Sequence, residues 1–136
     1  MSDATQSGAD HHNIRVYYED VDLGGIVYHS MYLNFCERAR SELFFSAGRS
    51  PIEGEYHFVV KHIDADFIGS GKFGQTLQVQ TRLTESKKAS FLLKQEVFEL
   101  GSMKKLFSMD IRLACMKGDR VAPIPAGFLD LFGQSN

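Results

Sequence analysis

Residues 17–40 read YYEDVDLGGIVYHSMYLNFCERAR, and they decide the fold because a strand, a Gly-Gly turn and an amphipathic helix follow one another within them. After the turn, apolar side chains recur at spacings of three and four residues, which predicts one buried helical face: Tyr32, Phe35, Cys36, Ala39 and Leu43. Gly48, followed by Pro51, predicts the end of this helix. One long helix therefore forms the centre of the predicted fold.

The segment before the helix predicts a flexible lead-in followed by a strand. Residues 1–12 are mostly small and polar, so we expect them to be a flexible lead-in to a single folded domain of residues 13–136. Within that domain Ile14, Val16 and Tyr18 alternate with more polar neighbours, which is the period of a half-buried strand.

The segment after the helix is rich in strand patterns. Alternating or β-branched apolar residues predict four longer strands, at residues 56–68, 77–83, 91–100 and 107–115. A short strand at Arg120–Ile124 and a brief helix that includes Phe128, Leu129 and Phe132 end the pattern. One long helix followed by four or five antiparallel strands predicts an α+β fold in which a curved sheet wraps the helix.

Composition argues against several classes of function. Fifteen Lys and Arg residues against seventeen Asp and Glu residues give a formal net charge of −2, so nothing predicts binding to nucleic acid or to an anionic membrane surface. The two cysteines, Cys36 and Cys115, do not form a disulfide framework, and we expect reduced, buried thiols. The chain shows no signal-peptide pattern and no apolar run of ~18 residues that would span a membrane, which predicts a cytoplasmic protein.

An aspartate and a histidine flank the predicted start of the helix. Asp22 precedes Gly24 and Gly25, and His29 follows them. A helix N-terminus presents unpaired backbone N–H groups and a partial positive charge, which can stabilise a developing oxyanion. A carboxylate held there can attack a carbonyl carbon or activate water. The plainer alternatives are an Asx turn at Asp22 and a His29 that only satisfies backbone groups at the helix start.

These residues also carry a family resemblance. The run YEDVDLGGIVYH, followed by CERARSEL, resembles the hot-dog-fold thioesterases, and in particular the tol-pal-associated acyl-CoA thioesterase group. That group belongs to the class similar to 4-hydroxybenzoyl-CoA thioesterase, and the resemblance covers residues 13–132. It implies a hot-dog fold, in which a curved antiparallel β-sheet wraps a long central α-helix. It also implies hydrolysis of an acyl-CoA thioester by a homodimer whose sheets join edge to edge, often paired again into a homotetramer.

The resemblance assigns catalytic roles within the motif. Asp22 matches the catalytic carboxylate of the family and His29 matches the histidine that closes the motif, whereas Asp20 is not the aligned carboxylate. Gly25 and Tyr28 lie in the same motif, and we expect them to contact the substrate.

The phosphates of coenzyme A require a second group of residues. Lys87, Lys88 and Ser90 are our candidates, because related enzymes bring the corresponding hairpin to the nucleotide, often from the neighbouring subunit. A solvated turn is the alternative interpretation. Residues 66–71 read DFIGSG where relatives often have a proline-containing turn, which leaves the shape of this loop open.

The chemistry of a thioester explains why an aspartate, a histidine and backbone N–H groups suffice for its hydrolysis. The leaving thiol has a pKa of roughly 8.5 if it behaves like cysteine, so it can depart as a thiolate without a strong acid. Backbone N–H groups near His29 can stabilise the oxyanion. Asp22 can act as a nucleophile that forms a mixed anhydride, or as a general base, and the sequence does not choose between these routes. The His29 side chain can orient the thioester, position water or protonate the departing sulfur.

Other groups of residues in the chain give weaker evidence for a functional site. Cys36 lies on the apolar stripe, which argues against a Cys–His nucleophile with His29. The GSGK run at residues 69–72 lacks the features of a phosphate loop, and His57 and His62 lie on opposite faces of a strand, so we expect no metal site.

The sequence thus predicts an enzyme of lipid metabolism that needs no cofactor, since coenzyme A is part of its substrate. The substrates expected are short- to medium-chain or aromatic acyl-CoA, or acyl groups on acyl carrier protein. The main alternative is a non-hydrolytic acyl-thioester binding or scaffolding protein linked to envelope lipid synthesis. An acyl-CoA dehydratase on the same fold is a weaker alternative.

Overall fold

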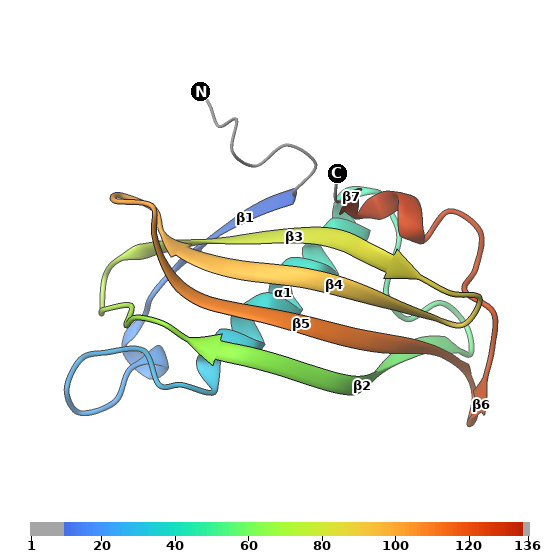
Figure 1. Cartoon of the computed structure of the whole chain (residues 1–136), viewed down its shortest axis with the longest axis horizontal. Helices are drawn as coiled ribbons and strands as arrows, with labels where there is room; N and C mark the ends of the chain where they lie inside the picture. Colours follow the sequence, from blue (N-terminus) through green and yellow to red (C-terminus); the bar gives the residue numbers. More distant parts are fainter. Residues whose placement is uncertain (1–9, 135–136) are drawn as a thin grey trace.

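The computed structural model describes residues 10–134 and shows one long helix packed against the inner face of a curved sheet (Figure 1). The helix is α1 (Met31–Ser46). The main strands, in chain order, are β1 (Asp10–Arg15), β2 (Tyr56–Phe67), β3 (Thr76–Ser86), β4 (Ser90–Glu99) and β5 (Lys104–Lys117). Two short strands, β6 (Arg120–Val121) and β7 (Gly133–Gln134), and two single-turn 3-10 helices (Tyr18–Asp20 and Leu129–Leu131) complete the fold.

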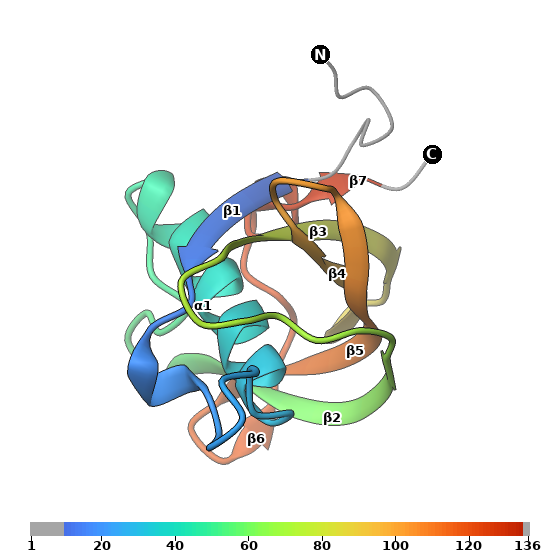
Figure 2. The same ribbon diagram turned by 90° about the vertical axis from the view of Figure 1, so that its left-hand side faces the viewer.

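The main strands lie in the order β1-β3-β4-β5-β2, and all four neighbouring pairs are antiparallel. The short strand β6 pairs with β5, and β7 runs parallel to β3. Viewed from one end, the sheet curls around α1 (Figure 2). This arrangement confirms the predicted α+β hot-dog architecture, and it leaves β2 as a long edge strand.

The apolar stripe of α1 is buried as predicted. Tyr32, Phe35, Cys36 and Ala39 are each at most 2% exposed, whereas Leu43 is only partly buried. The predicted inner faces of β3 and β5 are buried against this stripe, and each large apolar side chain so buried contributes roughly 1.5–3 kcal/mol. The helix is therefore held by its packing against the sheet.

A glycine ends α1 as the sequence predicted. Gly48 has a φ of 74°, and the N–H groups of Gly48 and Arg49 donate to the carbonyl oxygens of Phe45 and Phe44, at 3.0 and 2.8 Å. These two bonds form a Schellman motif, in which the left-handed residue is usually glycine.

Replacing Gly48 by Ala should lower the free energy of unfolding by roughly 1–2 kcal/mol, because an L-residue is strained in the left-handed region. A Cβ atom at Gly48 would meet no heavy atom within 4 Å, so backbone strain is the only expected cost. Urea unfolding measures the change, with Ser46→Ala, at the exposed last helical residue, as a control expected to stay near the wild type. Equal unfolding midpoints for Gly48→Ala and wild type would contradict the role given to this glycine.

Two predictions at the N-terminal end were wrong. The flexible lead-in was predicted to reach residue 12, but β1 begins at Asp10, and His11 and His12 pair with Gln80 and Val79 of β3. The rest of that lead-in, residues 1–9, lies outside the described residues. The first strand was also predicted to continue through Tyr18, which instead belongs to a 3-10 turn and is 82% exposed.

The C-terminal elements are shorter than predicted. The strand expected after residue 119 ends at Val121, two residues before Pro123, which has no N–H group to donate to a strand partner. The brief helix expected near Phe128 is the 3-10 turn Leu129–Leu131.

Candidate active site

The Gly-Gly segment forms a small antiparallel loop between the first 3-10 turn and α1. Val21 and Val27 form a bridge, the N–H of Asp22 donates to the carbonyl oxygen of Ile26 at 3.0 Å, and Gly25 adopts a φ of 78°. Because this φ is unfavourable for residues with a Cβ atom, Gly25 is needed for the turn itself.

A second segment anchors the loop from outside. The N–H of Val27 donates to the carbonyl oxygen of Gly71 at 2.9 Å, and the N–H of Phe73 donates to that of Gly25 at 3.0 Å. The Tyr32 hydroxyl accepts a hydrogen bond from the Gly71 N–H at 2.9 Å, and its ring stacks on Phe107 at 5.3 Å. Burial raises the pKa of Tyr32, against a smaller opposing effect of the Gly71 bond. Tyr32, which the sequence predicted only as a core residue, therefore also fixes the loop against α1.

Asp22 is exposed, and its carboxylate is held by local backbone. Oδ1 accepts a hydrogen bond from the Gly24 N–H at 2.9 Å, which is the Asx-turn contact. Oδ2 accepts no hydrogen bond from residues 10–134. The side chain borders a surface hollow that is lined by aromatic, aliphatic and glycine residues: Tyr18, Val21, Leu23, Gly25 and Phe73. The local turn thus orients the carboxylate at the edge of this hollow and leaves one of its oxygens without a hydrogen bond to residues 10–134.

His29 lies at the start of α1 with an exposed side chain. Its ring packs on Tyr28, with a centroid distance of 4.4 Å, and meets the edge of Phe67 at 6.1 Å. The N–H groups of Met31, Tyr32 and Leu33 already donate to carbonyl oxygens three residues earlier. Within the described part of the chain, the N–H groups of His29 and Ser30 have no acceptor, so these two amides are the free donors at the helix start.

Asp20 supports this arrangement, although the sequence did not predict a role for it. The side chain is 2% exposed; Oδ2 accepts the Tyr17 N–H at 2.8 Å, and Oδ1 has no partner in residues 10–134. Its carbonyl oxygen accepts the N–H of Tyr28, the residue before His29, at 3.0 Å. An acidic residue three positions after a turn start is a known capping pattern, and that spacing was the available signal.

The predicted substrate-binding residues fall into two separate groups. Gly25 and Tyr28 belong to the Asp22 loop, but Lys87 and Lys88 lie in the hairpin between β3 and β4, at the far end of the sheet (Figure 1). Since β3 spans 11 residues, that hairpin is roughly 30 Å or more from the start of β3 in the same chain. Ser90 accepts a hydrogen bond from Arg112 at 3.3 Å. A single chain therefore does not bring the two groups together.

The described residues contain little that supports other kinds of chemistry. Burial raises the pKa of Cys36 to about 12, against a smaller effect of Arg40, so this thiol is not a reactive thiolate at neutral pH. Both cysteines are free and buried, as predicted. Between residues 10 and 134, no three metal-ligating side chains gather into a group. In the same range, no helix has the length and apolar character needed to cross a membrane.

Several known proteins are similar to this chain in sequence. The family model of the thioesterase superfamily matches residues 24–105, which is more than half of the chain. An acyl-CoA thioesterase of Helicobacter pylori, YbgC, is 40% identical over 117 residues, covering 81% of this chain and 88% of the relative. The Haemophilus influenzae acyl-CoA thioesterase YbgC is 36% identical over 115 residues, covering 82% of this chain and 83% of the relative.

Solved structures show the same fold. A probable thioesterase from Bartonella henselae superposes with a TM-score of 0.79 at 28% identity, covering 86% of this chain and 99% of that chain. A 1,4-dihydroxy-2-naphthoyl-CoA thioesterase from Synechocystis superposes with a TM-score of 0.83 at 23% identity, covering 91% and 95%, and supports the fold alone. The predictions of a hot-dog fold and of a thioesterase-type enzyme are confirmed. The chain belongs to the thioesterase superfamily.

Proposed function

We propose that this enzyme hydrolyses the thioester of acyl-CoA, with Asp22 as its catalytic carboxylate. The observation that carries the proposal is the oriented carboxylate at a surface hollow, on the same loop as the free amides of His29 and Ser30. The relatives named acyl-CoA thioesterases support the choice of acyl-CoA. Release of coenzyme A thiol from a panel of acyl-CoA esters, from acetyl to palmitoyl and including benzoyl, tests it.

The proposed reaction uses the Asp22 carboxylate and the backbone N–H groups at the start of α1. Asp22 Oδ2 attacks the thioester carbonyl carbon, or takes a proton from the water that does so. The carbonyl oxygen becomes an oxyanion, and the N–H groups of His29 or Ser30 donate hydrogen bonds to it. The C–S bond then breaks and releases the thiolate. In the first route, water hydrolyses the resulting mixed anhydride. Single-turnover hydrolysis in isotope-labelled water tests the first route, because the label appears on the Asp22 carboxylate when water attacks the Asp22 carbon of the anhydride, and it does not appear there when Asp22 acts only as a base.

The active unit in this proposal is a homodimer formed along β2. Within residues 10–134 this strand is paired with β5 on one side only, and it exposes apolar side chains: Val60, Ile63 and Phe67 are 49%, 36% and 54% exposed. A long, exposed, apolar edge strand is a ready site for pairing with another chain. Antiparallel pairing of two copies of β2 around a twofold axis turns the partner end for end. The partner's β3–β4 hairpin then lies towards the end that carries Asp22, which would let Lys87 and Lys88 contact the coenzyme A phosphates.

Replacing Val60 by Lys should weaken this association at least about tenfold, since the new charge would have to be buried at the interface. Light scattering coupled to size-exclusion chromatography, over a dilution series, measures the mass of each species. Val121→Lys, at a 65% exposed position on β6, is the matched control and should leave the mass unchanged. A wild-type chain that is monomeric at all concentrations, or a Val60→Lys dimer as tight as wild type, would contradict pairing along β2.

The more specific expectations about substrate, assembly, location and pathway rest on the sequence alone. Short- to medium-chain or aromatic acyl groups, acyl carrier protein thioesters, a tetramer, a cytoplasmic location and a link to envelope lipid metabolism all stay predictions. Tight acyl-CoA binding without turnover of any ester would favour the alternative of a non-hydrolytic binding protein.

A further inference from the structure

A second cavity, of about 420 Å³, lies between the C-terminal half of α1 and the sheet. Five apolar side chains from α1, the strands and the C-terminal segment form much of its wall: Phe44, Phe58, Phe91, Leu113 and Phe132. Its volume is in the range of small-molecule binding sites. Arg40 in its wall is nine residues after Met31, so the cavity is roughly 13 Å along the helix from the free amides at its start.

Arg40 brings a positive charge to the wall of this cavity, which also includes the side chains of Glu37 and His57. Burial lowers the pKa of its guanidinium, while Cys36 and Glu37 have smaller opposing effects. The group nevertheless stays protonated, because arginine does not lose its proton in proteins. No carboxylate of residues 10–134 lies within 4.0 Å of its nitrogens; Glu37 is near enough to act on its pKa but forms no ion pair with it. The charge in the cavity therefore has no bonded counterion from the described chain.

The sheet holds this guanidinium in position. Nη1 donates to Oε1 of Gln95 at 2.9 Å, and the Gln95 amide in turn donates to the Cys36 carbonyl oxygen and to Thr81 Oγ1, both at 3.0 Å. Gln95 and Thr81 are 0% and 1% exposed. One of the five N–H donors of Arg40 is used in this way, which leaves the remaining N–H groups for another acceptor.

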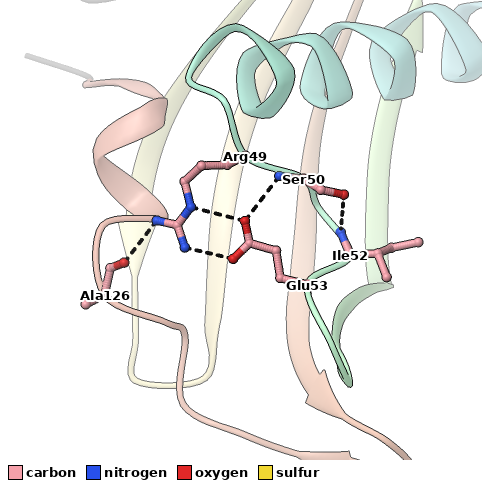
Figure 3. A network of polar contacts seen from close by, with 5 residues as sticks. All are labelled: Arg49, Ser50, Ile52, Glu53 and Ala126. Atoms are coloured by element: carbon pink, nitrogen blue, oxygen red, sulfur yellow. Dashed lines mark hydrogen bonds and ion pairs between the residues drawn. The ribbon is translucent and has the colours of Figure 1, made fainter.

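Three other arginines, unlike Arg40, form ion pairs with carboxylates of the chain. Arg49, Arg82 and Arg112 each bond a carboxylate of the chain, from Glu53, Glu96 and Glu85. Figure 3 shows the first of these pairs, in which both oxygens of Glu53 are bound by Arg49. Arg15, Arg38 and Arg120 form no ion pair within residues 10–134 either, but these three are exposed, whereas Arg40 is partly buried in the wall of the cavity.

The wall near the helix end is fixed by the network in Figure 3. The Ser50 N–H donates to Glu53 at 3.2 Å, the Ile52 N–H donates to Ser50 Oγ at 3.1 Å, and Arg49 donates to the carbonyl oxygen of Ala126 at 3.2 Å. Ile52 is part of the cavity wall. The cavity is therefore bounded by a loop that is tied to the C-terminal segment.

We infer that this cavity binds a carboxylate with an apolar body, and that Arg40 receives the carboxylate. A guanidinium matches two carboxylate oxygens in one plane, and the phenylalanine walls match an aliphatic or aromatic body. Two sources of this chemistry are open to test: a free carboxylic acid, or the distal carboxylate of an acyl group attached to coenzyme A. Binding of a free acid does not depend on the proposed hydrolysis, whereas the second source rests on it.

Titration calorimetry with octanoate and octanamide tests the recognition directly, since the two probes have the same length and differ in charge. Octanoate should bind wild type about tenfold to a hundredfold more tightly than octanamide, as expected for charge-assisted hydrogen bonds. Arg40→Met should remove this preference, and Arg40→Lys should keep part of it. Arg38→Met, at an exposed position on the same helix, should keep all of it. Thermal unfolding checks each variant, and the comparison in wild type stands even if Arg40→Met does not fold.

The source of the carboxylate is decided by a second pair of probes. A higher kcat/KM for sebacoyl-CoA than for decanoyl-CoA, lost in Arg40→Met, assigns the carboxylate to the acyl group, because a ten-carbon chain is long enough to reach from the thioester site to Arg40. Octanoate binding without that preference assigns it to a free acid. Asp22→Asn should bind octanoate like wild type, so a failure of the proposed hydrolysis does not affect this test. Equal binding of octanoate and octanamide by wild type, or a preference that survives in Arg40→Met, would overturn the inference. It would also be overturned if neither probe bound and sebacoyl-CoA were not preferred to decanoyl-CoA.

Discussion

An Asp22→Asn variant is expected to fold normally and to hydrolyse acyl-CoA esters at least ~10²-fold more slowly than the wild type. Asparagine retains a side-chain oxygen that can accept the Gly24 N–H, so the turn around the glycines should persist. The variant loses the negative charge that attacks the carbonyl carbon or removes a proton from water. The expected loss therefore lies in kcat, with little change in the free energy of unfolding.

Thiol release from the same ester panel, by wild type and variant at matched concentrations, measures this loss. Asp119→Asn, at an exposed position in the turn between β5 and β6, is the control for removing one carboxylate and should keep the wild-type rate. An Asp22→Asn enzyme with wild-type kcat would show that the carboxylate is not catalytic. An unfolded variant would instead assign Asp22 to the turn, as the plainer interpretation of its sequence position does.

The central helix and the inner faces of the sheet were predictable because their signals are local and periodic. Tyr32, Phe35 and Cys36 repeat with the period of a helix, and the strand faces alternate with a period of two. The start of β1 was missed because Asp10, His11 and His12 are polar. They are ordered by pairing with β3, which is distant in sequence.

The site was predictable only in part, for a related reason. Asp22 and His29 belong to one short motif, so their shared loop follows from the sequence alone. Tyr18 continues the alternation of the strand before it, yet the chain turns there, and the Asp20 carboxylate accepts a backbone N–H within that turn. The bond between Arg40 and Gln95 joins the helix to a strand 55 residues away, and no local pattern predicts it. Contacts of this kind require the assembled fold.

A His29→Pro variant is expected to lose roughly 10²- to 10³-fold in kcat, whereas His29→Ala should lose much less. Alanine removes the imidazole and keeps the backbone N–H, while proline removes both. His29 is the second residue of the turn closed by the 2.8 Å bond from the Met31 N–H to the Tyr28 carbonyl oxygen, and proline is favoured at that position of a turn. The two variants therefore separate the amide from the side chain with limited disturbance of the helix start.

Steady-state rates with the best ester of the panel, together with thermal unfolding of both variants, provide the measurement. A large loss in His29→Pro alone, with the fold intact, assigns oxyanion stabilisation to the His29 amide. Equal and large losses in both variants would assign the role to the imidazole, which is exposed and free of hydrogen bonds to residues 10–134. If neither variant loses activity, His29 is not part of the oxyanion site, and the free N–H of Ser30 becomes the remaining donor at this end of α1.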